Sequence, residues 1–502
     1  MKSHVHQLIC SALLLFLLCC AYGCAAAVVN LKSEDGWEPI RIGVYPGGLS
    51  VWIKSCRRYS TNKVSFGSFA TVTYEKLIIC DPVTGITPEK AKMMHKVVVE
   101  GSRLHMDRLL VKPVKGNLLI EKHHGYDFKE RCPDAFPRRD HLTKGIPKVD
   151  FALYLGLTAS HEEHRICSKD ANGRPTSGLI KLNPKEFNNT RHYIRLAAHE
   201  IGHALGFTLE EFKENDMLLE EKSNTGRNIM ALLTDTVKKK AQDHYNCKSL
   251  NHMELDYRSG KNEYPHWKRR HAKDELMSTY VNRPSAMYYT ELTLAAFHSL
   301  PYYKADFSKA ETMTWGRNAS CEFLTGKCVE DSTPKFPEMF CNDSTTVLRC
   351  TTDRASLGTC SMKQLASDVP REFQYFTNKR IGSPSSDMMD HCPVIESSWK
   401  TSCEFGDEDA MPGSIVSNMS RCLEGEFLEP REPKYIGTFR DICANVKCEN
   451  GILKVQYKGN EKWHECTDGK RIDIEKGPAL YGGKIVCPKY SDFCTDKPEE
   501  SQ

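Results

Sequence analysis

Apolar residues in the first 200 positions follow two different periods, one typical of strands and one typical of helices. Short apolar runs bounded by turn residues predict strands at Ile40–Tyr45, Thr71–Ile79, Val149–Leu157 and Leu179–Leu182. A helical pattern begins near Pro88 and continues through Leu104. This mixture predicts an α+β first domain.

The segment from Arg191 to Leu205 has the clearest helical period. Its apolar positions form one buried stripe, made of Ile194, Ala198, Ile201 and Leu205. His199 and His203 fall on a different side, so the helix is expected to line a cleft. Gly206 ends the pattern, because glycine readily takes the positive φ at which helices stop. Residues 207–261 are polar with weak periodicity, which predicts an inserted region of helices and loops.

The cysteines divide the chain unevenly. Four of the 22 lie before residue 28, which leaves 18, an even number typical of disulfide pairing in an oxidising compartment. Five precede residue 250, and thirteen lie between Cys321 and Cys494, too densely for an ordinary core. This contrast indicates a domain change near residue 325. We expect domains at 28–207, 208–326 and 327–502, the last one rich in cysteine and mostly β or irregular.

The first 27 residues have the layout of a secretory signal peptide. Lys2 precedes an apolar stretch that is shorter than the ~20 residues of a membrane-spanning helix, and small residues follow up to Ala27, after which we place the cleavage. No later segment is apolar enough to span a membrane, and the polar end gives no lipid-anchor signal. The product is expected to be secreted. Four N-glycosylation candidates agree with secretion: Asn188, Asn318, Asn342 and Asn418.

Net charge gives no sign of a nucleic-acid partner, because +4 is spread over a mixed surface. The chemistry is instead concentrated in His199-Glu200-Ile201-Gly202-His203, an H-E-x-x-H pattern. Histidines four residues apart on a helix can bind one metal ion, typically Zn²⁺. The zinc would acidify a water molecule, and Glu200 would take its proton as the general base of peptide hydrolysis.

A hydrolytic zinc site needs a third protein ligand and keeps one position for water. Gly206 extends the motif to H-E-x-x-H-x-x-G, the opening of the metzincin signature, which places the third ligand three residues later. That position is Leu209. The residues alone leave four candidates: His244, His252, His266 and His271.

Longer segments resemble a known family. They are Tyr264-Pro265-His266-Trp267, Asp274-Glu275-Leu276-Met277 and Ala305-Asp306-Phe307-Ser308-Lys309-Ala310-Glu311. These segments, and the cysteine spacing of the last third, resemble leishmanolysin, the major surface protease family of trypanosomatid parasites. The resemblance runs from about Val28 to Cys494.

The resemblance implies a metzincin-like catalytic domain, with a twisted mixed sheet and an active-site helix. It implies one zinc ion bound by His199, His203 and His266, with Met277 in a Met-turn below the metal. It also implies nine disulfides, among them Cys56–Cys80, Cys132–Cys167 and Cys247–Cys321. Gly178–Leu182 resembles the edge strand that pairs with extended substrate, and the implied substrates are proteins and peptides, including host proteins.

The chain departs from the family in lacking its long propeptide and its lipid-anchor tail, which favours secretion over display at the cell surface. Tyr280 could contact a transition-state oxyanion, but packing is the better interpretation. The main rival function is a catalytically silent adhesion or decoy protein on the same fold. A structural zinc site is a weaker alternative, because it gives Glu200 no purpose.

Overall fold

The structure is a computed structural model of the 502-residue chain. It describes residues 36–61, 78–120, 128–160, 162–222, 228–256, 265–343, 345–430 and 439–494. The chain divides into two units, Met1–Glu38 and Pro39–Gln502. Only Gly36 to Glu38 are described in the first unit, so the following account concerns the second. The predicted signal peptide lies outside the described residues.

A four-stranded mixed sheet forms the first layer of this unit. Its strands are β2 (Ile42–Tyr45), β6 (Phe151–Leu157), β7 (Glu163–Lys169) and β8 (Pro175–Leu182). The order is β2-β6-β8-β7, in which β2, β6 and β8 are parallel and β7 runs antiparallel to β8. Every residue of β6 is buried, as expected for a strand covered on both faces.

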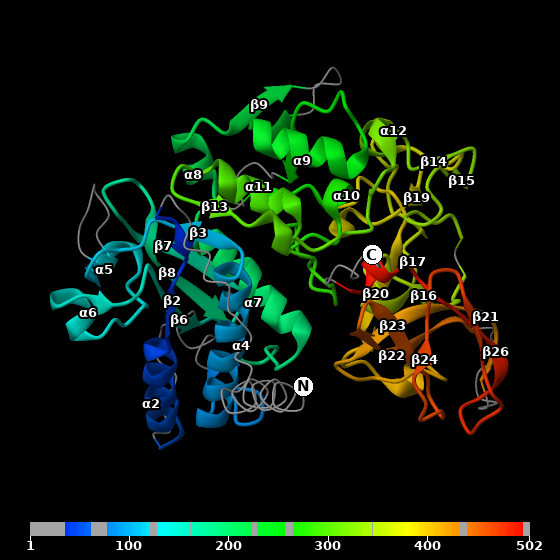
Figure 1. The fold of residues 1–502 in the computed structure, drawn as a ribbon, viewed down its shortest axis with the longest axis horizontal. Helices are drawn as coiled ribbons and strands as arrows, with labels where there is room; N and C mark the ends of the chain where they lie inside the picture. The colour runs from blue at the N-terminus through cyan, green and yellow to red at the C-terminus, as the bar shows by residue number, and fades with distance from the viewer. Residues whose placement is uncertain are drawn as a thin grey trace, which may run out of the picture. The chain divides into compact units, whose positions relative to one another are not determined.

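Three helices pack on or beside this sheet: α2 (Gly47–Thr61), α4 (Pro88–Met106) and α7 (Arg191–Ala204). Helix α7 contacts β7 and β8, and α4 runs alongside it (Figure 1). A Cβ atom on Gly101 of α4 would lie 2.9 Å from the Ile194 carbonyl oxygen of α7. Glycine at this position therefore lets the two helices approach closely.

Two predictions about this part of the chain are wrong. The first is the edge strand: β8, which contains Gly178–Leu182, pairs with β6 on one side and β7 on the other, so its backbone hydrogen bonds are taken. The edge strands of this sheet are β2 and β7. The second is the last part of the strand predicted at Thr71–Ile79: Ile78 and Ile79 are helical, and residues 71–77 lie outside the described residues. Ile79 is fully buried beside the Cys56–Cys80 disulfide, and this packing overrides the strand preference of isoleucine.

The inserted region also differs from the prediction, because it contains strands as well as helices. Its sheet has the order β12-β11-β10-β9, and all described pairs are antiparallel. The elements are α8 (Leu209–Glu214), β9 (Leu218–Lys222), β10 (Asn228–Leu232), α9 (Asp235–Tyr245), β11 (Met253–Asp256) and β12 (His266–Trp267). These strands are short and partly exposed, so their apolar pattern is too weak to be recognised in the sequence.

Shorter elements connect these layers. Those of the first 150 residues are β1 (Glu38–Pro39), β3 (Leu109–Val111), β4 (Asn117–Leu118), α5 (Phe128–Arg131), α6 (Arg139–Thr143) and β5 (Ile146–Pro147). Those after β12 are α10 (Arg269–Ala272), α11 (Glu291–Ser299), β13 (Lys304–Ala305), η1 (Phe307–Lys309) and α12 (Ser320–Thr325). Strand β13 pairs with β3, so the chain returns to its first part after the insertion.

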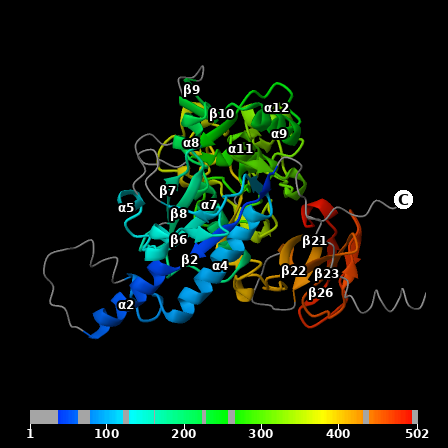
Figure 2. The same cartoon turned by 60° about the vertical axis from the view of Figure 1, so that its left-hand side comes forward.

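The C-terminal region is rich in β-strands and disulfides. A six-stranded sheet of order β24-β23-β22-β21-β26-β25 has its own apolar core, and Figure 2 shows β21, β22, β23 and β26 together. The strands are β14 (Val329–Glu330), β15 (Thr333–Pro334), β16 (Arg349–Cys350), β17 (Ser356–Cys360), β18 (Lys363–Gln364), β19 (Ile381–Gly382), β20 (Ile395–Ser402), β21 (Ser420–Pro430), β22 (Phe439–Glu449), β23 (Ile452–Gln456), β24 (His464–Glu465), β25 (Arg471–Asp473) and β26 (Leu480–Val486). Short 3-10 turns separate them: η2 (Arg371–Phe373), η3 (Ser385–Asp387), η4 (Glu408–Ala410) and η5 (Tyr490–Asp492).

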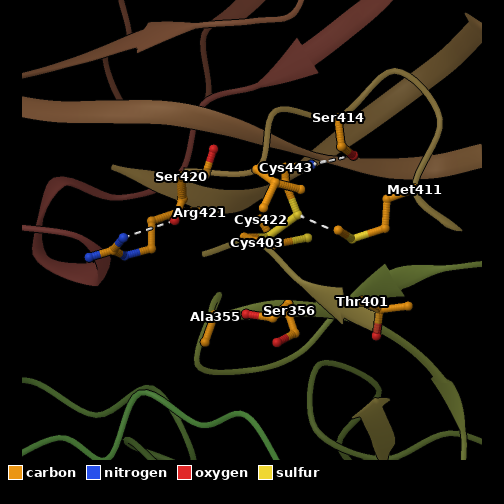
Figure 3. Close-up of a disulfide and its surroundings, with 12 residues drawn as sticks. Ala355, Ser356, Thr401, Cys403, Met411, Ser414, Ser420, Arg421, Cys422 and Cys443 are labelled. Carbon is orange, nitrogen blue, oxygen red and sulfur yellow. Dashed lines mark hydrogen bonds between the residues drawn. A yellow bond between two sulfur atoms is a disulfide. The ribbon is translucent and has the colours of Figure 1, made fainter. Parts of the chain in front are cut away.

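Nine disulfides join the 18 cysteines after the first 27 residues, which confirms the predicted number. The three pairings that the resemblance implied, Cys56–Cys80, Cys132–Cys167 and Cys247–Cys321, are all present. Figure 3 shows the Cys403–Cys443 bridge, beside which the Met411 sulfur lies 3.8 Å from the Cys443 sulfur. Among the described residues, no helix has the length and apolar character needed to cross a membrane.

Candidate metal centre

Helix α7 carries His199, Glu200 and His203. Its first turn is closed by Thr190, whose hydroxyl oxygen accepts a hydrogen bond from a backbone N–H of that turn. A second acceptor comes from far along the chain: the Glu404 carboxylate accepts hydrogen bonds from Arg191 N at 2.5 Å and His192 N at 3.3 Å. A carboxylate at this end also interacts favourably with the helix dipole.

The far end of α7 closes as the sequence predicts. Gly206 follows the helix with φ of +121°, a backbone conformation that side chains rarely allow. The turn that follows brings the Phe207 carbonyl back toward His203, so the end of the helix fixes the orientation of that ring.

His266 reaches the same place from the inserted sheet. It stands in β12, opposite Asp256 of β11. The N–H of the next residue, Trp267, donates to the Met277 carbonyl at 2.8 Å. The sheet of the insertion therefore carries this histidine to the helix. The other candidates lie elsewhere: His244 and His271 bond to the backbone carbonyls of Trp315 and Leu324.

The three histidines present their Nε2 atoms to one another. All three pairs of Nε2 atoms are 3.2 Å apart. The Nδ1–H of His199 donates to the Leu276 carbonyl at 2.6 Å, and that of His203 donates to the Phe207 carbonyl at 2.8 Å. Because Nδ1 carries the proton in these two rings, their Nε2 lone pairs are directed to the shared centre.

This arrangement fits a tetrahedral metal ion. Two ligands at a Zn–N distance of about 2.0–2.1 Å lie about 3.3 Å apart in a tetrahedron, close to the spacing of the three nitrogens. Burial lowers the pKa of His199, and it lowers the pKa values of His203 and His266 well below the usual range, with the neighbouring histidines adding to these two shifts. The rings are therefore neutral, which is the form that binds metal.

Glu200 lies beside this group but does not belong to it. The group of possible ligands consists of the three histidines alone among the described residues. Burial raises the pKa of Glu200 to about 7, against the opposing charge interaction with His199. The site thus has three histidines that could bind one metal ion and one adjacent carboxylate, the composition of hydrolytic zinc centres that keep a position for water.

Met277 lies against helix α7 at Gly202, between His199 and His203. A Cβ atom on Gly202 would be only 2.7 Å from the Met277 sulfur, and Met277 is fully buried. The turn around it is held by Glu275, whose carboxylate accepts a hydrogen bond from the Met277 N–H at 2.6 Å. The preceding residue, Leu276, supplies the carbonyl that orients His199.

The sequence analysis missed His164. This residue lies in β7, and its Nδ1 is 2.7 Å from Glu200 Oε2. Its ring stacks on that of His203, with the ring centroids 4.0 Å apart. No motif marks it; the available signal was a histidine at an inward position of a strand that leads to Cys167. Burial lowers the pKa of His164 to about 3, so the ring is neutral.

A cavity of about 570 Å³ adjoins the site along the edge strand. Its lining residues from β7 are His164, Arg165 and Ile166, and Thr208 to Glu210 line it from the start of α8. Tyr280 lies on another side of α7, where its hydroxyl is 3.2 Å from His192 Nε2. The four glycosylation candidates Asn188, Asn318, Asn342 and Asn418 are all exposed, and their modification stays a prediction.

Three converging imidazoles on a helix and a neighbouring strand, with a buried carboxylate next to them, define a centre of the metallopeptidase class. The family model described as Leishmanolysin matches residues 20–500. Leishmanolysin of Leishmania major is 31% identical over 491 residues, which cover 94% of this chain and 78% of the relative. A leishmanolysin homolog of Crithidia fasciculata is 32% identical over 495 residues, with 94% and 72% covered.

A leishmanolysin-like peptidase of Caenorhabditis elegans is more distant, at 25% identity over 455 residues, with 71% of this chain and 67% of the relative covered. The chain belongs to the leishmanolysin family, a family of metalloendopeptidases. Family membership implies a metal at the centre and protein substrates.

Proposed function

We propose that this chain is a secreted zinc endopeptidase that hydrolyses peptide bonds in proteins. The observation that carries the proposal is the convergence of three neutral Nε2 atoms at 3.2 Å from one another beside the carboxylate of Glu200. Zinc peptidases typically have a glutamate directly after the first histidine ligand of the helix.

The metal would be held by His199, His203 and His266, with Met277 below it. Zinc, when bound there, supplies a Lewis acid that acidifies water and polarises a substrate carbonyl. The chain orients this chemistry through backbone carbonyls, because Leu276 and Phe207 fix the tautomers of two ligands.

Glu200 is the proposed general base. Its Oε2 accepts the hydrogen bond from His164, and its Oε1 makes no hydrogen bond to a described residue. Oε1 is therefore available to take the proton of the attacking water and then to deliver it to the amide nitrogen of the departing product. A pKa raised to about 7 makes the side chain an effective acid as well as a base near neutral pH.

The substrate is proposed to bind as an extended strand along β7. This strand is one of the two edge strands of the four-stranded sheet, and the cavity beside it is lined by three of its residues. Backbone hydrogen bonds to an edge strand accept many sequences, which suits an endopeptidase of broad range, host proteins included.

Secretion is supported by the nine disulfides, which require an oxidising compartment. We retain the signal peptide at 1–27 and the divisions 28–207, 208–326 and 327–502 as proposals. The separate apolar core formed by residues between Leu423 and Cys494 supports a distinct C-terminal domain. A silent adhesion or decoy protein is the alternative, and the intact arrangement around Glu200 argues against it.

The test is hydrolysis of casein by the secreted product, with Glu200→Ala as the inactive variant and Glu221→Ala as a matched control. Glu221 is an exposed residue of β9, outside the centre. We expect activity in the wild type and in Glu221→Ala. Activity should be lost in Glu200→Ala and in wild type treated with a chelator. Added zinc should restore the activity of the chelated wild type but not that of Glu200→Ala. A folded, zinc-loaded wild type that cleaves nothing would favour the adhesion alternative.

A further inference from the structure

We propose that His164 is a positioning residue that holds the carboxylate of Glu200 in place from the substrate-binding edge strand. The inference rests on the proposed function, because it assigns a partner to the general base of that site. It adds a residue that the H-E-x-x-H pattern does not contain.

The contact is direct and buried. His164 Nδ1 lies 2.7 Å from Glu200 Oε2, and the two side chains are 6% and 9% exposed. With Glu200 ionised, the Nδ1–H donates to the carboxylate, which is a charge-assisted hydrogen bond. The imidazole plane is also fixed, because it lies within 16° of parallel to the ring of His203 at a centroid distance of 4.0 Å.

This bond has a clear effect on a flexible side chain. Glu200 extends from α7 through three rotatable bonds, so an unrestrained carboxylate would populate several rotamers. His164 selects one of them by engaging Oε2, which leaves Oε1 for proton transfer. Among the described residues, the group of side chains that could hold a metal ion together contains His199, His203 and His266 and does not include His164.

The position of His164 in the fold makes this contact more than a local restraint. It belongs to β7, the edge strand that adjoins the cavity, and it is flanked by the partly buried Glu163 and the exposed Arg165. A peptide paired with β7 is aligned by the backbone of the same strand that carries His164. The register of the substrate and the position of the base are therefore set by one element of structure.

Two substitutions of similar size separate hydrogen bonding from packing. In His164→Asn the side-chain amide can donate from nearly the place of Nδ1, whereas His164→Leu has no donor. We expect His164→Leu to lower kcat for a peptide substrate on the order of 10- to 100-fold with little change in KM, the usual range for a hydrogen bond to a charged group. His164→Asn should retain most of kcat. The same two substitutions at His252, which lines a different pocket, are the control.

Zinc affinity, measured by competition with a chelator, provides a readout besides activity. It should change by no more than a few-fold in both His164 variants, because His164 acts on Glu200 and not on a ligand. A loss of zinc affinity of 10-fold or more in His164→Leu would overturn the inference, since it would show that the residue acts through the stacked ring of His203. Equal loss of kcat in the Asn and Leu variants would overturn it too.

A double-mutant cycle decides the inference even if the wild type cleaves no substrate. His164→Leu should lower the midpoint of thermal unfolding of the zinc-loaded protein, because it leaves a buried carboxylate without its donor. In the Glu200→Ala background the same substitution should have a clearly smaller effect. Equal shifts in the two backgrounds would overturn the inference, whereas an inactive wild type with unequal shifts would contradict only the proposed function.

Discussion

Gly202 occupies the point at which helix α7 meets the turn that contains Met277, and its replacement by alanine should disturb both. Two opposing effects decide the result. An alanine in the middle of a helix gains about 1 kcal/mol over glycine in the free energy of folding. The added Cβ would lie 2.7 Å from the Met277 sulfur and 3.2 Å from its Cε, whereas a relaxed contact needs about 3.5–4.0 Å.

The sulfur must therefore move by about 1 Å, and Met277 is fully buried. Overpacking of this kind typically costs about 1–3 kcal/mol, which equals or exceeds the helix gain. We expect a net loss of stability of up to about 2 kcal/mol. We also expect weaker zinc binding, because Leu276, next to Met277, supplies the carbonyl that orients His199.

The assay compares the midpoint of thermal unfolding and the zinc affinity of the wild type, Gly202→Ala, Met277→Ala and the double variant. Removing the Met277 side chain should make Gly202→Ala less harmful, so the two effects should not add. A higher unfolding midpoint for Gly202→Ala with unchanged zinc affinity would refute the reasoning. It would show that the turn around Met277 accommodates the added methyl group without a loss of stability or of zinc affinity.

Three further predictions concern stability. Glu404→Ala should destabilise the protein by about 1 kcal/mol, since two N–H groups at the start of α7 lose their acceptor, and Glu408→Ala provides the exposed-glutamate control in thermal unfolding. Burial lowers the pKa of His105 to about 4, so the stability contributed by the neutral ring is complete above the unfolded pKa of 6.5 and is lost as pH falls toward 4. The loss in the free energy of unfolding amounts to about 2 kcal/mol between pH 7 and pH 5. The same pH dependence of unfolding in a His105→Gln variant would contradict this prediction. Chelation should lower the unfolding midpoint, and zinc at 1,000 times its Kd should return about 4 kcal/mol, whereas no response to zinc would show that the site holds no metal.

The sequence was most informative where the structure is local. The helix at Arg191–Leu205 and its end at Gly206 were predicted within a residue, because a period of 3.6 and a glycine with positive φ are properties of one short segment. His199 and His203 follow from the same spacing. Their roles as ligands remain part of the proposed function.

Features that depend on pairing between distant segments could not be predicted in the same way. Residue patterns left four candidates for the third histidine, because His266 is carried to the helix by pairing of β12 with β11. The resemblance placed the edge strand at Gly178–Leu182, in β8, whereas the pairing order of the strands puts β7 at that edge. His164 was missed for the same reason, since its contact with Glu200 joins a strand to a helix 36 residues later.

The acceptor at the start of α7 has a consequence for the order in which the protein can mature. Glu404 follows Arg191 by 213 residues, so a ribosome that has made both helix histidines must still add a large part of the chain before this carboxylate exists. The histidines of α7 are therefore synthesised before the carboxylate of Glu404 that accepts hydrogen bonds from the start of their helix. Helix α7 therefore gains this acceptor only once residue 404 of 502 has been made, well after His266, the last of the three histidines.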